Sequence, residues 1–367
     1  MCERKYMERA VELAERGTGA VNPNPLVGAV IVKKGKIIGE GWHEKYGGLH
    51  AERNALKNCN ESPEGATIYV TLTPCCHYGK TPPCTEAIIE NKLKKVVIGS
   101  RDPNPLVGEK SISILRDAGI QVVQDFMKEE CDALNPVFFH YIRTKRPYVV
   151  MKFAETLDGK IAAYTGESKW ITGETARAQV HQSRNRYSGI MVGSNTVLKD
   201  NPLLTCRIPG GRNPVRIVCD TSLRTPLESN LVKTADEVPL IIATAVNEEE
   251  KLKPYRDRNC TVLILDKGKD NHIDLNQLMD KLGEMNIDSI LLEGGATLNW
   301  SAMEAAIVNK VEAYIAPKLL GGTDAPSPVR GKGFSHPDYA MKLKKIKITP
   351  LGEDILVEGE VETCSQE

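Results

Sequence analysis

The sequence predicts an α/β protein of two domains, the second of which contains a mixed sheet. Helical and strand-like hydrophobic patterns alternate along most of the 367 residues, as they do in α/β folds. A polar, basic stretch at 141–147 interrupts the alternation, which then starts again with an apolar strand. A chain of this length is too long to fold around a single ordinary hydrophobic core, so we expect two domains. We place them at 1–146 and 147–367, on either side of the interruption.

The first domain begins with an amphipathic helix, because apolar residues recur at helical spacing from Tyr6 to Ala14. A Lys-Gly turn at 34–35 separates two short apolar runs and predicts a β-hairpin. Pro83 can occupy the first turn of the helix that Cys84 begins. The predicted elements are helices at 3–16, 50–58, 84–91 and 110–118, and strands at 27–32, 36–39, 66–72, 95–99 and 120–123.

The second domain repeats the alternation of apolar strands and helical patterns. Two β-rich runs close the chain with no helix between them, which favours an antiparallel finish and therefore a mixed sheet. The predicted strands are 148–154, 188–192, 214–220, 239–244, 261–265, 289–292, 311–316, 342–348 and 354–361, and the predicted helices are 173–187, 274–285 and one that follows residue 295 to about 306.

The composition argues against a nucleic acid or a membrane as the partner of this protein. Lys and Arg number 48 and balance 48 Asp and Glu, and aromatic residues make up only 5%, so neither charge nor stacking indicates a nucleic acid. No apolar stretch reaches the length of a membrane span, and the N-terminus lacks the apolar run of a signal peptide. Ten cysteines without disulfide-framework spacing indicate a reducing compartment. We expect a cytoplasmic protein that acts on a small molecule.

The most specific motif in the chain combines one histidine with two cysteines. His50 and Glu52 are followed by Cys75 and Cys84, each of which comes directly after a proline. Zinc prefers imidazole and thiolate ligands, and a catalytic zinc keeps one open position for water. Zinc deaminases share the pattern H-x-E and P-C-x-x-C, in which the glutamate moves protons. We therefore predict Zn²⁺ ligands at His50, Cys75 and Cys84, with Glu52 as the catalytic acid and base.

A closed structural site with four ligands is the alternative, and His43, Cys76 or His77 could supply the fourth ligand. Two points favour a catalytic metal. Glu52 would have no purpose in a structural site, and the start of a helix at Cys84 would stabilise its thiolate. The two cysteines are separated by eight residues instead of the two in the general deaminase pattern.

A six-residue segment, Pro-Asn-Pro-Leu-Val-Gly, occurs at 23–28 and again at 103–108. Chance similarity between two turns is one explanation. The other is that both loops line one pocket, where asparagine amides donate and accept hydrogen bonds with a heterocycle. The Gly-Lys-Thr triplet that contains Lys80 is no phosphate loop, because Pro74 stands where such a loop needs glycine. His77 and Lys80 are either solvated loop side chains or substrate contacts.

Two loops of the second domain are candidates for binding a dinucleotide, although no G-x-G-x-x-G segment follows any strand. The Glu-Gly-Gly segment at 293–295 stands between a strand and a helix, where backbone amides can stabilise a phosphate; a plain turn is the alternative. The loop at 192–196 also follows a strand. Trp170 is expected in the core. Arg184 and Arg207 are either anion-binding residues or solvated surface charges.

Several motifs spread over both halves occur together in one known family. They are Asn22–Gly28, His50–Glu52, Pro74–Cys84, Leu157–Lys160, Ser168–Thr172, Asp200–Pro202, Glu293–Gly295 and Ala316–Lys318. With these motifs the chain resembles, over essentially its full length, the bifunctional riboflavin-biosynthesis family that joins a pyrimidine deaminase to a pyrimidine reductase. The eight-residue spacer between the cysteines is specific to this family among zinc deaminases.

The resemblance implies a cytidine-deaminase-like three-layer α/β/α domain followed by a dihydrofolate-reductase-like α/β domain. It implies zinc-dependent deamination of 2,5-diamino-6-ribosylamino-4(3H)-pyrimidinone 5′-phosphate. NADPH-dependent reduction of the ribosyl group to ribityl would follow and give 5-amino-6-ribitylamino-uracil 5′-phosphate. A homo-oligomer, either a dimer or a tetramer, is also expected.

Carried over motif by motif, the resemblance implies three sets of binding residues. The substrate of the deaminase would contact Asn24, His43, His77, Lys80, Asp102 and Asn104. NADPH would contact Ala154, Trp170, Thr196, Asp200 and the run Gly295, Ala296, Thr297, Leu298, Asn299, Trp300 and Ser301. The substrate of the reductase would contact Ser168, Arg184, Leu204, Arg207 and Glu293. Proton transfer in the reductase would involve Asp200, Lys152 or Glu293.

The chain departs from the family at Thr73, where glutamate is usual, and we expect altered hydrogen bonds beside the zinc site with the chemistry retained. Cys76, where serine is common, is a milder change. Two other functions are weighed against the enzyme: a deaminase acting on RNA, and a non-catalytic regulator that binds pyrimidine nucleotides. The balanced charge and the long spacer count against the first, and the intact Glu52 with its three ligands counts against the second.

Overall fold

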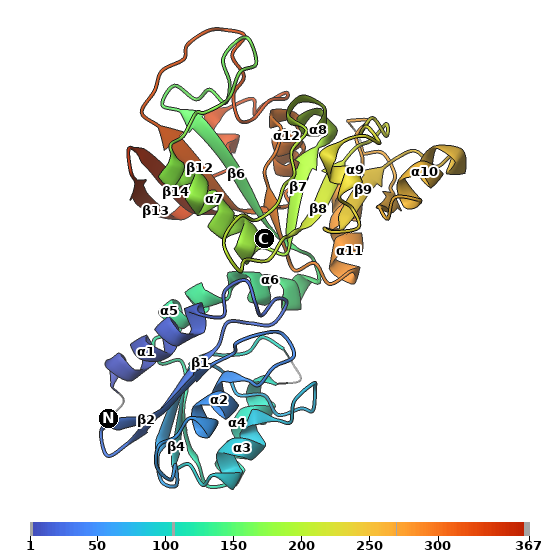
Figure 1. The fold of residues 1–367 in the computed structure, drawn as a ribbon. Coiled ribbons are helices and arrows are strands. Elements are labelled where there is room, and N and C mark those ends of the chain that lie inside the picture. Colours follow the sequence, from blue (N-terminus) through green and yellow to red (C-terminus); the bar gives the residue numbers. More distant parts are fainter. Residues whose placement is uncertain (1–2, 105–106, 269, 363–367) are drawn as a thin grey trace. The chain divides into compact units, whose positions relative to one another are not determined.

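Two β-sheets organise the chain, each in its own unit, Met1–Lys145 and Arg146–Glu367 (Figure 1). The structure is a computed structural model that describes residues 3–104, 107–268 and 270–362. Within those ranges no helix has the length and apolar character needed to span a membrane.

The first unit contains a five-stranded sheet in the order β2-β1-β3-β4-β5. The β1–β2 hairpin is antiparallel, as predicted, whereas β3, β4 and β5 run parallel. The elements are α1 Arg4–Glu15, β1 Gly28–Lys33, β2 Lys36–Trp42, α2 Ala51–Lys57, β3 Thr67–Leu72, α3 Cys84–Glu90, β4 Lys95–Ser100, α4 Gly108–Asp117, β5 Gln121–Val123, α5 Lys128–Leu134 and α6 Pro136–Thr144.

Helices cover both faces of this sheet because its strands are apolar on both sides. Ile31 and Val70 belong to the core beneath α2, α3 and α4, whereas their neighbours Val30 and Tyr69 pack with α1. Side chains alternate between the two faces of a strand, so consecutive apolar residues need helices on each side. The predicted α/β/α arrangement is confirmed.

The polar stretch at 141–147, where the sequence predicted the domain boundary, is helical up to Thr144. Helix α6 begins at Pro136, whose fixed φ suits the first turn, and it extends to Thr144. The side chain of Asn135 just before it is buried and exchanges two hydrogen bonds with the backbone of Leu26 (2.7 and 2.8 Å). The helix was not predicted because the polar, basic character of 141–147 was read as a break between elements. Pro83 also differs from the prediction, because it lies at the N-cap of α3 and not within its first turn.

The second unit contains a nine-stranded sheet in the order β10-β9-β8-β7-β11-β6-β12-β14-β13. All neighbours are parallel except the pairs β12–β14 and β14–β13, so the predicted mixed sheet with an antiparallel finish is confirmed. The elements are β6 Tyr148–Thr156, α7 Glu174–Arg186, β7 Gly189–Gly193, α8 Ser194–Asp200, β8 Val215–Cys219, α9 Asn230–Lys233, β9 Leu240–Thr244, α10 Glu249–Arg256, β10 Thr261–Ile264, α11 Leu275–Glu284, β11 Ser289–Leu292, α12 Ala296–Glu304, β12 Val308–Ala316, η1 Pro337–Tyr339, β13 Leu343–Leu351 and β14 Asp354–Val361.

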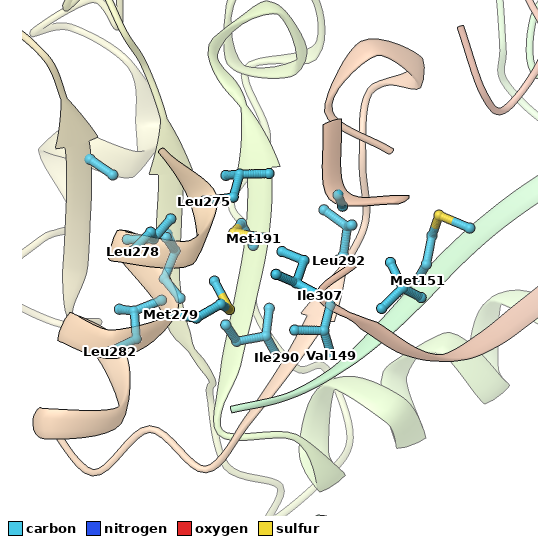
Figure 2. Packing of buried hydrophobic residues seen from close by; sticks show 14 of the residues in the cluster. Val149, Met151, Met191, Leu275, Leu278, Met279, Leu282, Ile290, Leu292 and Ile307 are labelled. Carbon is cyan, nitrogen blue, oxygen red and sulfur yellow. The ribbon is translucent and has the colours of Figure 1, made fainter. Parts of the chain in front are cut away.

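The main core of this unit lies where α11 packs on the parallel strands (Figure 2). Leu278 and Leu282 of α11 belong to the same core cluster as Met191 of β7 and Ile290 of β11. All four residues are fully buried. Residues that alternate with these, such as Ile190 and Val192, enter a second core on the other face. The parallel strands thus bring their carboxyl ends to one rigid edge.

Three short α-helices of the second unit were not predicted, and neither was α5 of the first unit. Helices α8 and α9 contain seven and four residues, too few for a hydrophobic period to be recognised. Helix α10 carries Pro254 inside it, and an interior proline normally argues against a helix. Of these helices, α8 bears on function because it places Thr196 and Asp200 beside the strand edge.

Candidate active sites

The ends of two helices and one strand bring the histidine and the two cysteines together. His50 is the N-cap of α2, Cys75 follows β3, and Cys84 is the first residue of α3. Their ligand atoms all lie within 4.8 Å of one another. The Nδ1 atom of His50 lies 3.4 Å from Sγ of Cys75 and 3.5 Å from Sγ of Cys84.

These distances fit a tetrahedral zinc site. With Zn–S near 2.3 Å and Zn–N near 2.0 Å, adjacent sulfur and nitrogen ligands of Zn²⁺ stand roughly 3.5 Å apart. In the described part of the chain, the cluster has three members, His50, Cys75 and Cys84. None of the proposed fourth ligands joins it, so the geometry favours a site with an open position over a closed structural site.

Glu52 lies in the first turn of α2 and is 3% exposed. Burial, together with the neighbouring Cys75, raises the pKa of its carboxyl group above the usual value, although His50 opposes the shift. A carboxyl group with a raised pKa gives up and regains a proton near neutral pH more readily than an exposed one. The side chain therefore has the position and the electrostatics of a general acid and base beside the metal ligands.

The two cysteines differ in their surroundings. Hydrogen bonding from Cys84 and His50 lowers the pKa of Cys75 to about 4, against the effect of burial. The pKa of Cys84 is raised, chiefly by its hydrogen bond with Cys75 and by burial. The first N–H of α3 donates to Sγ of Cys75 (3.4 Å), so the start of α3 also stabilises a thiolate at Cys75.

Asn24 and His43 lie together beside the metal ligands. Nδ1 of His43 donates to the carbonyl of Leu49 (3.0 Å), and Nε2 therefore accepts from Nδ2 of Asn24 (3.1 Å). The His43 ring packs edge-on against His50, with ring centroids 5.4 Å apart. His43 therefore orients Asn24 through a hydrogen bond and His50 through ring packing. Within the described residues, no protein partner of the Asn24 side-chain oxygen is found, so this oxygen can accept a hydrogen bond from a ligand.

Asp102 and Asn104 follow β4. Asn104 belongs to the second copy of the repeated segment and Asp102 directly precedes that copy, of which residues 105 and 106 lie outside the described residues. Burial raises the pKa of Asp102 to about 6, with His77 opposing the shift. The Asp102 carboxylate accepts from the Asn104 N–H (2.8 Å). The hydroxyl of Thr73 accepts from the Asp102 N–H (3.2 Å) and donates to the carbonyl of Ser100. Thr73 thus supports the loop that carries Asp102.

The insert between the cysteines is held at its C-terminal end. Arg53, which the sequence reasoning missed, donates to the carbonyls of Pro82 and Pro83 (3.0 and 2.8 Å). Nζ of Lys80 lies 3.9 Å from the centroid of the exposed Tyr46 ring. His77 and Lys80 are both exposed, so they are available to an incoming molecule. The position of Arg53 directly after Glu52 was its sequence signal.

Replacing Cys84 with serine is expected to remove most of the bound zinc, because a hydroxyl is a poor substitute for a thiolate ligand. Elemental analysis of purified protein measures the zinc content. Cys76→Ser is the matched control, since Cys76 is the next cysteine in the chain and lies outside the ligand cluster. Full zinc content in the Cys84 variant, or equal loss in the control, would contradict the assignment.

The second unit contains a cavity of about 1340 Å³ at the carboxyl ends of its parallel strands. Ligand pockets in open α/β sheets lie at this edge, and a volume above roughly 1,000 Å³ exceeds what one drug-sized ligand fills. The cavity accordingly has room for a dinucleotide together with a second molecule. The predicted residues that line it are Lys152, Ala154, Ser168, Trp170, Arg184, Thr196, Asp200, Leu204, Arg207, Glu293, Gly295, Ala296, Thr297, Leu298, Asn299 and Ser301.

Trp300 is the one predicted residue of the second unit that the cavity does not include. Its indole packs edge-on against Phe334, with ring centroids 5.3 Å apart, and lines a separate hollow of about 580 Å³. Successive residues of α12 point in different directions, so Asn299 and Ser301 can face the main cavity while Trp300 faces away.

A buried carboxylate with two cations lies at the floor of the cavity. Glu293 pairs with Arg184 through two hydrogen bonds (2.7 and 2.8 Å), and Nζ of Lys152 lies 3.8 Å away. The third donor group of Arg184 is bound to the carbonyl of Thr205 (3.0 Å). Burial opposes ionisation, but Arg184 and Lys152 lower the pKa of Glu293 to about 2. Glu293 therefore stays ionised at neutral pH and cannot serve as a proton donor there.

The two glycine-containing loops are bound to each other. The carbonyl of Gly294 accepts from the Gly193 N–H (3.3 Å) and from the Thr196 hydroxyl (3.2 Å). Gly294 has a φ of +63°, and a Cβ there would stand 2.7 Å from the Asn299 side chain. Only glycine adopts this positive φ without strain and leaves room for the Asn299 side chain. The amides at the start of α12 consequently face the cavity from a fixed loop.

Trp170 is 63% exposed and lines the cavity, so its expected place in the core is wrong. The Arg177 guanidinium lies 4.5 Å from the ring centroid. Lys318 donates to the carbonyls of Trp170 and Ile171 (3.1 and 2.7 Å). An exposed indole whose backbone is held in this way can stack against a planar ligand. His181 also lines the cavity and was missed by the sequence reasoning, although it lies on the same face of α7 as Arg184.

Comparison with known families matches both units. Residues 1–100 match the family described as cytidine and deoxycytidylate deaminase zinc-binding region, and residues 147–357 match the RibD C-terminal domain. The second match covers more than half of the chain.

Full-length relatives show the same combination. The chain is 57% identical over 358 residues to the riboflavin biosynthesis protein RibD of Actinobacillus pleuropneumoniae, covering 98% of this chain and 95% of that one. It is 38% identical to the protein of that name from Escherichia coli, covering 97% and 98%. Among solved structures, Acinetobacter baumannii RibD superposes with a TM-score of 0.88 at 35% identity, and a deaminase/reductase from Thermotoga maritima with 0.86 at 40%, each covering 98% of both chains.

Proposed function

Because the chain belongs to the RibD family of bifunctional deaminase/reductases in riboflavin biosynthesis, we propose that each unit performs one step on a phosphorylated pyrimidine. The first unit deaminates 2,5-diamino-6-ribosylamino-4(3H)-pyrimidinone 5′-phosphate. The second reduces the ribosyl group of the product with NADPH, giving 5-amino-6-ribitylamino-uracil 5′-phosphate. The observation that carries the proposal is that one chain holds both the His50–Cys75–Cys84 cluster with buried Glu52 and a cavity large enough for two ligands.

In the deaminase, zinc bound by the three ligands would lower the pKa of a water molecule toward about 7. Glu52 takes a proton from the attacking water and delivers it to the ring nitrogen beside the reacting carbon. The same carboxyl group then protonates the departing amine. Asn24, Asp102 and Asn104 hold the heterocycle, since amide and carboxyl groups match its donors and acceptors. His43 fixes the orientation of Asn24, and His77 and Lys80 reach the phosphorylated side from the insert.

In the reductase, NADPH bound in the cavity would supply a hydride to the sugar carbon, which becomes imine-like when the ribose ring opens. Lys152 is the group we assign to deliver a proton to the ring oxygen, because its ammonium lines the cavity and is held by Glu293. Glu293 itself is a permanently ionised support for Lys152 and Arg184. Asp200 lies at the exposed end of α8 and is assigned to the cofactor, together with Thr196 and Ala154.

The substrate phosphate belongs with Arg207 and Ser168 in this scheme. Both line the cavity, and no protein partner of the Arg207 guanidinium is found in the described part of the chain. Arg184, by contrast, has three donors engaged by Glu293 and Thr205. We therefore propose that Arg184 orients Glu293 and the segment that contains Leu204 and Thr205, and that it does not bind the phosphate directly.

The cofactor would lie between Trp170 and the start of α12, whose amides suit a pyrophosphate. Trp170→Ala is expected to raise the KM for NADPH about tenfold, because one stacking face is lost. Steady-state kinetics at saturating pyrimidine measures this. Trp300→Phe is the matched control, since that indole faces a separate hollow, and it should leave the KM for NADPH unchanged. Equal effects of the two substitutions would contradict the placement.

Mass spectrometry of the products tests the proposed function. Purified protein is incubated with the diaminopyrimidine phosphate with and without NADPH. Without NADPH the product should have exchanged an NH for an oxygen, and with NADPH it should also have gained two hydrogens. No change in either reaction would refute both activities for this substrate. Comparing NADPH with NADH tests the cofactor separately.

We also propose that the enzyme works in a reducing cytoplasm. The cysteines of the described ranges are all free of disulfides, as expected for thiols kept reduced. A dimer or tetramer remains a prediction from the family resemblance, and light scattering of the purified protein would distinguish these states from a monomer.

A further inference from the structure

His181 lies on the wall of the reductase cavity and has no role in the scheme above. It belongs to α7, three residues before Arg184 and four after Arg177, and all three line the cavity. Residues three and four apart share one face of a helix. The face of α7 that orients Glu293 through Arg184 therefore also presents an imidazole.

One nitrogen of this imidazole is already committed. The backbone N–H of Arg207 donates to Nδ1 of His181 (3.3 Å). An N–H donor requires an unprotonated acceptor, so the proton of the neutral ring is on Nε2. Within the described ranges, no hydrogen bond to that Nε2–H is found. The side chain thus joins α7 to the segment that carries Leu204 and Arg207, and it keeps one donor free.

The charges around His181 keep the ring neutral. Of the charged groups that act on the ring, Arg184, Arg207 and Lys152 are cations and Glu293 is a carboxylate, so cations are in excess. Burial and then these cations lower the pKa of His181, while Glu293 opposes them. Protonation would also break the bond from the Arg207 N–H. A neutral ring in a positively charged surrounding is suited to donate to an anion.

We propose that His181 is a further substrate-binding residue of the reductase, donating its Nε2–H to a phosphate oxygen of the substrate beside Arg207. The inference rests on the proposed reductase function. Phosphate is the anion that the charge excess fits, because Glu293 already neutralises part of the charge on Arg184 and Lys152, whereas the Arg207 guanidinium is unpaired within the described ranges. Through Nδ1 the same ring fixes the Leu204–Arg207 segment.

Two substitutions separate the donor from the loop contact. The side-chain amide of Gln places its NH₂ group near the position of Nε2, whereas that of Asn places its oxygen near Nδ1. His181→Asn therefore keeps an acceptor for the Arg207 N–H and loses the donor. His181→Gln keeps the donor and loses the acceptor. Each variant is compared with wild type in the full-length enzyme, with the deaminase step as an internal control for folding.

The assay uses the deaminated pyrimidine with and without its 5′-phosphate, at saturating NADPH. With the phosphorylated substrate, His181→Asn should lower kcat/KM roughly tenfold to a hundredfold, mainly through KM, as expected for a hydrogen bond to a charged group. His181→Gln should stay within about threefold of wild type. With the dephosphorylated substrate, His181→Asn and wild type should be equal.

The outcomes distinguish this inference from the proposed function. If wild type does not reduce the phosphorylated substrate at all, the proposed function fails. If wild type reduces it and His181→Asn matches wild type, the donor role is refuted. A loss only in His181→Gln would show that the ring serves the loop alone. An equal penalty with both substrates would overturn the assignment to the phosphate.

Discussion

Replacing Glu52 with glutamine is expected to lower the deaminase kcat by at least a thousandfold, while zinc content stays unchanged. The glutamine fills the same buried space beside the metal ligands but cannot take up or release a proton. General acid–base catalysis contributes about 10²- to 10⁴-fold, and Glu52 handles the proton at more than one stage, so the upper part of that range applies. Product formation from the diaminopyrimidine phosphate measures the rate.

The same variant supplies its own control. Its reductase rate with the deaminated pyrimidine and NADPH should equal that of wild type, because the catalytic groups of that step belong to the other unit. Near-normal deamination would show that another group moves the proton, and Asp102, whose burial raises its pKa to about 6, would be the next candidate.

Replacing Glu293 with glutamine is expected to abolish most reductase activity and to destabilise the second unit. Glu293 and Arg184 are 10% and 14% exposed in their side chains, so the substitution leaves a buried guanidinium without its carboxylate. Breaking a buried ion pair in this way costs roughly 3–5 kcal/mol of the free energy of unfolding. Lys152 also loses its partner, and with it the orientation needed to deliver a proton. Chemical denaturation and single-turnover reduction measure the two effects.

A double variant separates stability from catalysis. Glu293→Gln combined with Arg184→Met also removes the guanidinium that the first substitution leaves without its carboxylate, so the free energy of unfolding should recover toward wild type. Reductase activity should remain low because Lys152 is still unsupported. Recovery of activity together with stability would show that Glu293 serves the fold alone.

The pH dependence of stability follows from the lowered pKa of Glu293. A carboxyl group with a folded pKa of about 2 and an ordinary value of 4.5 stabilises the fold fully above the ordinary value. That contribution is lost as the pH falls from about 4.5 toward 2. Acid unfolding of the Glu293→Gln variant should therefore be less steep across this interval than that of wild type.

The metal site was predictable from the sequence because each ligand stands at the boundary of an element with a clear pattern. Cys75 comes shortly after an apolar strand and Cys84 begins a helix, so local structure already limits where their thiols point. The strand order of the sheets was less accessible. It depends on which strands pair. β11 lies between β6 and β7, although about a hundred residues of the chain separate it from β7 and still more separate it from β6.

The electrostatics of the reductase cavity could not be predicted from local patterns. Arg184 and Glu293 are 109 positions apart, and only the fold shows that they neutralise each other. From the sequence, Arg184 therefore looked like either an anion-binding residue or a solvated surface charge. His181 and Arg53 were missed because their hydrogen-bond partners are backbone groups, which the residue types do not reveal. Only their positions, three residues before Arg184 and directly after Glu52, pointed to them. Trp170 looked like a core residue because the sequence does not show that its loop lies at the cavity rim.

The central claim is that one chain contains two independent active sites, and mixing two inactive variants tests it most directly. Glu52→Gln cannot deaminate and Glu293→Gln cannot reduce, so neither alone should convert the diaminopyrimidine phosphate into the ribityl product with NADPH. The mixture should do so, because the deaminated intermediate made by one variant can be reduced by the other. Mass spectrometry should find both the exchange of NH for oxygen and the added hydrogens. Deamination without reduction in the mixture, with each variant retaining its remaining activity, would contradict two separately working sites.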